Sequence, residues 1–250
     1  MQLQAYLDRI GYPSGLERTP ENLNRLIRCH LETVPFENLE FCYHPRKMSV
    51  EPEALYHKIV ERRRGGVCFE LNGLFHWLLE QLGYQVYPLH VRLHRGPGQP
   101  APITHRANMV TLDGRKYFCD VGYGGPGPKG LVSLDGPEEQ TIGGEPFRVE
   151  RSGLYTTIFR RDGEQWLANI TFADVPAINE DFSYLLFAFT ADPQSVFVVK
   201  RIVNLCLPDG GHLALTDMEF SARKNGERIH RTLQNEEEVR ELLRTEFGLD

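Results

Sequence analysis

The stretch RGGVCFELN, residues Arg64 to Asn72, separates a short basic run from the most strongly periodic apolar segment of the chain. Apolar residues after the two glycines recur at steps of three and four, a spacing that places them on one face of an α-helix. Gly83 stands where a C-cap glycine belongs. The pattern therefore predicts a helix over residues 68–82, with Cys68 in its first turn. Its apolar face comprises Cys68, Leu71, Leu74, Phe75, Leu78, Leu79 and Leu82.

The position of Cys68 gives its side chain a particular environment. The first N–H groups of a helix have no intrahelical partner, and the helix dipole adds partial positive charge there. A thiol in a first turn ionises more readily, and the thiolate is the nucleophilic form. Gly65 and Gly66 allow a sharp backbone turn that leaves space above the sulfur. Taken alone, such a cysteine is better interpreted as a buried structural residue.

A β-hairpin is predicted around Asp113-Gly114, because this dipeptide lies between two alternating apolar runs. A two-residue turn pairs Leu112 with Arg115, and the register that follows places His105 and Asp120 on the same face as diagonal neighbours. Both could instead be ordinary polar residues near a turn. However, an unpaired carboxylate in an apolar strand is costly, so we expect Asp120 to bond to His105.

These three residues together indicate thiol nucleophilic catalysis. In that chemistry the histidine keeps the cysteine ionised, and the aspartate orients the histidine and supports its positive charge. The chain order Cys68, His105, Asp120 fits papain-like and transglutaminase-like enzymes. A cysteine hydrolase or amidase with the same triad is therefore an alternative to a transferase. An inactive binding protein is a third possibility, which the loss of a triad residue would have favoured.

The pattern along the chain indicates an α+β protein, with helices first and strands later. Thr19-Pro20 and Glu51-Pro52 are typical helix starts, and an irregular apolar connection over residues 34–41 separates them. Short alternating runs follow Gly83, and residues 196–207 are expected to form a strand. A last helix is predicted to begin after an N-cap at Asn235.

Composition excludes several classes of protein. The net charge is −6, so nucleic acid is an unexpected main partner. No apolar run reaches the roughly 18–20 residues of a membrane span, and no signal peptide is recognisable. The five cysteines are scattered without a C-x-x-C pair, which argues against disulfides and a metal site and for a reducing cytoplasm. The basic run Arg62–Arg64 is interpreted as a solvated helix end.

Several motifs together resemble the signature of the arylamine N-acetyltransferase family. They occur in chain order and span most of the sequence: VPFENL at 34–39, RGGVCFELN at 64–72, Thr104-His105, CDVGYGG at 119–125 and the C-terminal segment 241–249. The resemblance implies a helical bundle over residues 1–83, a β-barrel over 84–190 and an α/β lid over 191–250.

The same resemblance implies a Cys68–His105–Asp120 triad that uses acetyl-coenzyme A and no metal. The thiolate would take the acetyl group, coenzyme A would leave, and an arylamine, arylhydrazine or arylhydroxylamine would accept it in a ping-pong reaction. Such an enzyme would acetylate xenobiotics as a monomer or homodimer.

The resemblance also implies binding roles for five residues. Phe36 and Tyr123 would line the acceptor pocket, and Phe197 would close the cleft from the lid. The Gly124 N–H would help to bind the oxyanion, and Gly124 and Gly125 would let the donor's pantetheine arm approach. Tyr123 replaces a more usual phenylalanine and adds a hydroxyl group to the pocket.

Overall fold

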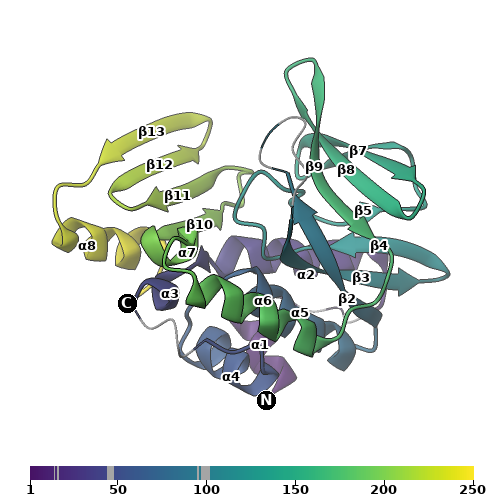
Figure 1. The fold of residues 1–250 in the computed structure, drawn as a ribbon, viewed down its shortest axis with the longest axis horizontal. Helices are drawn as coiled ribbons and strands as arrows, with labels where there is room; N and C mark the ends of the chain where they lie inside the picture. The colour runs from purple at the N-terminus through teal and green to yellow at the C-terminus, as the bar shows by residue number, and fades with distance from the viewer. Residues whose placement is uncertain (14, 16, 44–47, 95, 97–101) are drawn as a thin grey trace.

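The computed structural model describes residues 1–13, 15, 17–43, 48–94, 96 and 102–250. It has a helical N-terminal part and two antiparallel sheets, which lie on opposite sides of the view in Figure 1. The predicted α+β class is confirmed. No helix within the described ranges is both long and apolar enough to cross a membrane.

The N-terminal part packs its helices around α5, the helix that begins at Cys68. Its last residue is Gln81, and Gly83 follows with a φ of 78°, so the predicted helix and its glycine stop are confirmed. Thr19 caps α2 as predicted, because its Oγ1 accepts a bond from the Asn22 N–H at 3.2 Å. The elements are α1 (Leu3–Arg9), α2 (Pro20–Thr33), β1 (Phe36–Glu37), α3 (Leu39–Tyr43), α4 (Pro52–Tyr56), the π-helix η2 (His57–Glu61) and α5 (Cys68–Gln81).

The larger sheet has eight strands in the order β5-β4-β3-β2-β9-β8-β7-β6 and curls into a nearly closed barrel. The side chain of Gln140 on β6 bonds to the Ser133 backbone on β5 at 2.9 and 2.8 Å, which links the two edge strands. The strands are β2 (Gln85–Leu93), β3 (Ile103–Leu112), β4 (Arg115–Cys119), β5 (Val132–Ser133), β6 (Glu139–Ile142), β7 (Glu145–Ser152), β8 (Tyr155–Asp162) and β9 (Gln165–Ala173).

The hairpin of β3 and β4 has the predicted register. Leu112 pairs with Arg115, and the pairing continues to Asn108 and Cys119. Asp113 and Gly114 both have positive φ values, 49° and 75°, as the tight turn of a two-residue hairpin requires. Asp120 therefore lies immediately beyond the end of β4.

The smaller sheet has five strands in the order β1-β10-β11-β12-β13. Its edge strand β1 comes from the helical part, so this sheet joins a segment of the N-terminal part to the C-terminal strands. Helix α8 (Glu236–Glu246) covers it and is capped by Asn235 as predicted. The other strands are β10 (Ile202–Cys206), β11 (His212–Thr216), β12 (Glu219–Lys224) and β13 (Glu227–Thr232).

The segment between the sheets differs from the prediction. Residues 196–207 do not form one strand: Val196–Val199 form the one-turn helix α7, and β10 begins only at Ile202. The β-branched valines favour a strand, but the turn lets Phe197 pack against Phe36 and Phe41. Helix α6 (Asn179–Ala191), which precedes α7 in Figure 1, was not predicted.

Candidate active site

Cys68 is held at the start of α5 by a cap that comes from its own helix. The Glu70 carboxylate accepts a hydrogen bond from the Val67 N–H at 2.9 Å, so the first turn begins at Cys68. Lys58 in turn donates to Glu70 at 2.8 Å, and both of these side chains are buried. The sulfur lies in an apolar cluster and only 3% of Cys68 is exposed.

The two glycines before Cys68 bring β1 against the start of α5. A Cβ at Gly65 would lie 2.1 Å from the Pro35 carbonyl oxygen, so no other residue fits there. Beside it, the Glu37 N–H donates to the Gly66 carbonyl at 2.9 Å. Arg64 is not the solvated residue that we predicted, because it pairs with the buried Glu37 carboxylate at 2.8 Å.

His105 on β3 and Asp120 after β4 form the hydrogen bond that the hairpin register predicts. His105 Nε2 lies 2.6 Å from Asp120 Oδ2, and both residues are buried. Nδ1 is then the imidazole nitrogen that is available to the Cys68 sulfur. The three residues are thus brought together from a helix start, a strand and a strand end.

Asn72 ties the helix to the hairpin, a role that our sequence reasoning missed. Its Nδ2 donates to Asp120 Oδ1 at 2.8 Å and to the Arg106 carbonyl at 2.6 Å, while its Oδ1 accepts from the Val121 N–H at 2.9 Å. Asn72 follows Cys68 by four residues and so shares its helix face. An amide side chain on an otherwise apolar, buried face is the signal that could have revealed it.

The charges around His105 favour its protonated form. Burial by itself disfavours the imidazolium, but the negative charges of Asp120 and Cys68 outweigh this effect and raise the pKa of His105 well above its ordinary value. An imidazolium beside the sulfur stabilises a thiolate electrostatically. A sulfur, an imidazole and a carboxylate in this order can activate a thiol for attack on a carbonyl group.

The aromatic residues predicted to bind substrate surround this centre. The rings of Tyr123 and His105 lie 5.8 Å apart, and those of Phe36 and Phe197 lie 6.3 Å apart. A Cβ at Gly124 would come within 2.7 Å of the Phe36 ring, so this glycine lets the loop lie against it.

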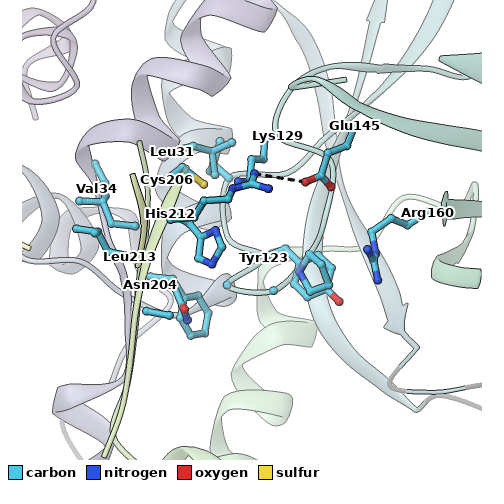
Figure 2. Close-up of a pocket in the computed structure, with 18 residues that line it drawn as sticks. Leu31, Val34, Tyr123, Lys129, Glu145, Arg160, Asn204, Cys206, His212 and Leu213 are labelled. Carbon is cyan, nitrogen blue, oxygen red and sulfur yellow. Dashed lines mark ion pairs between the residues drawn. The ribbon is translucent and has the colours of Figure 1, made fainter. Parts of the chain in front are cut away.

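A cavity of about 290 Å³ lies between the barrel and the five-stranded sheet (Figure 2). Phe36, Tyr123, Gly124 and Gly125 contribute to its lining, whereas Cys68 and Phe197 do not. Its charged lining residues are Lys129, Glu145, Arg160 and Arg223, and the Glu145–Arg223 pair spans the cavity at 3.8 Å. Among the described residues, three cations against one carboxylate make this cavity suitable for an anionic ligand.

Comparison with known proteins agrees with this geometry. A family model described as N-acetyltransferase matches residues 19–250. The arylamine N-acetyltransferase of Mycolicibacterium smegmatis is 30% identical over 256 residues, covering 100% of this chain and 92% of that protein. The corresponding protein of Escherichia coli (strain K12) is 31% identical over 250 residues, covering 99% and 88%.

Solved structures show the same fold. The arylamine N-acetyltransferase from Salmonella typhimurium superposes with a TM-score of 0.92 at 30% identity, covering 99% of this chain and 90% of that one. The Mycobacterium marinum enzyme in complex with CoA gives 0.91 at 28% identity, covering 99% and 93%. The chain therefore belongs to the arylamine N-acetyltransferase family and is an acyltransferase.

Proposed function

We propose that this protein transfers an acetyl group from acetyl-coenzyme A to an aromatic amine or hydrazine through an acetyl-Cys68 intermediate. The observation that carries the proposal is the buried constellation of Cys68, His105 and Asp120, in which the His105–Asp120 bond measures 2.6 Å. The names of the relatives support the substrate class, and the CoA complex of a relative supports the donor.

In this proposal each residue has one task. The Cys68 thiolate attacks the acetyl carbonyl carbon, and the Gly124 N–H helps to stabilise the oxyanion. His105 gives its proton to the departing thiolate of coenzyme A, which completes the first half-reaction. The neutral His105 then takes a proton from the amine as it attacks the acetyl-Cys68 thioester, and the Cys68 thiolate is regenerated. Asp120 keeps Nε2 engaged throughout, so that Nδ1 faces the sulfur.

The cavity beside this centre is the proposed donor site. Lys129, Arg160 and Arg223 supply positive charge for phosphate groups, and Gly124 and Gly125 leave room for a narrow pantetheine arm. Phe36 and Tyr123 stand where this cavity approaches the triad, and Phe197 packs on Phe36 from the side of the lid. We propose these three aromatic residues as the acceptor pocket.

We propose the domain limits 1–83, 84–190 and 191–250 for the three parts that meet at this centre. The first supplies Cys68, the second supplies His105 and Asp120, and the third supplies Phe197. We also propose a reducing cytoplasm as the compartment, because all five cysteines are free thiols.

Burial of the sulfur favours transfer over hydrolysis. Only 3% of Cys68 is exposed, and aromatic residues including Phe41 and Phe69 surround it. Such surroundings shield an acetyl thioester from water until an amine enters. A hydrolase needs the opposite, because water must reach the thioester.

Intact-mass spectrometry tests the proposal. Acetyl-coenzyme A alone should increase the mass by one acetyl group, located on Cys68, and Cys68→Ala should acquire none. Aniline should then discharge the adduct faster than buffer does and yield acetanilide. Absence of both the adduct and the acetylated amine would refute the transferase proposal, whereas rapid release of acetate that is indifferent to aniline would indicate the hydrolase.

A further inference from the structure

Asn38 directly follows strand β1, and its side chain bonds to the segment that contains α7. The residue is only 1% exposed. Its Nδ2 donates to the Phe197 carbonyl at 2.9 Å and to the Lys200 carbonyl at 2.6 Å. Its Oδ1 accepts from the N–H of Ile202, the first residue of β10, at 2.7 Å. These partners lie 159 to 164 residues away in the chain, so Asn38 joins the N-terminal part to a distant turn.

The bonds from Asn38 satisfy carbonyl groups that the backbone of α7 leaves without a partner. The last carbonyls of a helix have no intrahelical donor. The Arg201 N–H, which would reach the Phe197 carbonyl if the helix continued, donates instead to Asp217 Oδ1 at 2.9 Å. Among the described residues, the other hydrogen bonds to residues 194–200 come from residues 192–200 themselves and from the Cys42 thiol.

Packing by itself holds α7 weakly, because none of its four side chains is fully buried. Phe197 is the residue of this turn that reaches the site. Its ring lies 6.3 Å from that of Phe36 and 5.6 Å from that of Phe41, and it packs against the apolar cluster that contains Cys68. Phe36 lies two residues before Asn38. The amide of Asn38 therefore sets the distance between two walls of the proposed acceptor pocket.

We infer that Asn38 is a positioning residue that holds Phe197 over the acceptor pocket and so protects the acetyl-Cys68 thioester from water. The inference rests on the proposed function. In hydrolysis, water attacks the thioester carbonyl carbon, the C–S bond breaks, and acetate and the free thiol are formed. Transfer breaks the same bond, with the amine as nucleophile. The ratio of transfer to hydrolysis therefore depends on how well the aromatic cover excludes water before the amine enters.

The test is the lifetime of the acetylated protein in buffer, measured by intact-mass spectrometry after excess acetyl-coenzyme A has been removed. Asn38→Ala removes all three side-chain bonds, and Asn38→Leu removes them while it retains a side chain of similar size. The Asn38 N–H still donates to the Ile202 carbonyl at 3.2 Å in both variants, so the pairing of β1 with β10 is retained. Circular dichroism and thermal melting show which variants are folded, and either one is sufficient.

Two further variants make the test specific. Phe197→Ala removes the ring itself. Asn169→Ala removes another buried amide, which lies on β9 of the barrel, and is the matched control for the loss of such a side chain.

We expect the half-life of acetyl-Cys68 in buffer to fall by about tenfold in both Asn38 variants, because each neutral hydrogen bond changes an equilibrium constant by roughly fivefold. Phe197→Ala should have a similar effect, and adding Asn38→Ala to it should cause no further loss, since Asn38 acts through this ring. Asn169→Ala should retain the wild-type half-life. An unchanged half-life in a folded Asn38 variant, additive effects with Phe197→Ala, or an equal loss in Asn169→Ala would overturn the inference.

Hydrogen exchange of the unacetylated protein tests the anchor without any acetyl transfer. The amides of residues 192–201 should exchange about tenfold faster in the Asn38 variants, whereas those of α5 should not change. Unchanged exchange in residues 192–201 would also overturn the inference. Failure of the acetyltransferase proposal would appear separately, as a wild-type protein that forms no acetyl adduct although the exchange result holds.

Discussion

Replacement of Asp120 by asparagine removes the carboxylate charge beside His105 but keeps the size of the side chain. Asp120 Oδ1 accepts bonds from Asn72 Nδ2 and the Gly122 N–H, both at 2.8 Å, and the asparagine oxygen can retain both. Oδ2, which faces His105 Nε2 at 2.6 Å, becomes an amide donor. The imidazole must then accept at Nε2 and carry its proton on Nδ1, which is the wrong tautomer for a base that faces the sulfur.

The expected effect is a large loss of rate in a folded protein. The same exchange in a serine triad lowers kcat by roughly 10⁴ through the wrong tautomer. That factor corresponds to about 5 kcal/mol of transition-state stabilisation. Asp120 also contributes the largest charge effect that raises the pKa of His105. The attraction between protonated His105 and Asp120 therefore stabilises the fold fully below about pH 6.5, and this stabilisation is lost as the pH rises through the raised pKa of His105. Asp120→Asn should reduce this dependence of the unfolding free energy on pH.

The assay is single-turnover acetylation of Cys68 by acetyl-coenzyme A, with steady-state transfer to aniline measured beside it. Asp8→Asn on the exposed face of α1 is the control for the chemical change, and it should retain full activity. Circular dichroism and urea unfolding check the fold and its pH dependence. Turnover within tenfold of the wild type in a folded Asp120→Asn protein would refute the assigned role of the carboxylate.

Three further variants test other parts of the structure. Lys58→Met should lower the free energy of unfolding, measured by urea titration, by about 3–5 kcal/mol, because it leaves the buried Glu70 carboxylate without its cationic partner. Adding Glu70→Gln to this variant should recover part of the loss. Gly124→Ala should lower kcat/KM for aniline by roughly 10², because its Cβ would displace the Phe36 ring; an unaltered value would disprove this contact. Burial lowers the pKa of His30 to about 3, so its neutral form is favoured and stability is lost as the pH falls below about 6.5. His30→Leu should therefore lose about 3 kcal/mol less than the wild type between pH 7 and pH 4 in urea unfolding, and equal losses would contradict this explanation.

Local patterns were sufficient to predict the elements that carry the site. The helix start at Cys68, the caps at Thr19 and Asn235 and the turn at Asp113-Gly114 all depend on residues within a few positions of one another. Such short-range preferences act in any surrounding structure. The hairpin register then placed His105 near Asp120, because the period of a strand propagates from its turn.

Helix α6 and the one-turn helix α7 were decided by tertiary packing. Along α6, Phe182 is buried whereas Tyr184 and Phe187 are 78% and 70% exposed, so apolar residues occur around the helix without a clear period. At α7, packing of the half-buried Phe197 against aromatic rings from the helical part outweighs the strand preference of its valines. Neither effect can be read from nearby residues.

The sequence by itself determined which residues we propose as reactive and where the helix and the hairpin that carry them begin. The tertiary structure alone decided their support: Asn72 bonds to Asp120, Arg64 pairs with Glu37, and Arg106 is buried beside α5. These partners are 27 to 48 residues apart in the first two cases. The physical reason is that a buried polar group takes whichever partner the fold brings within bonding distance, and local periodicity carries no information about distant segments.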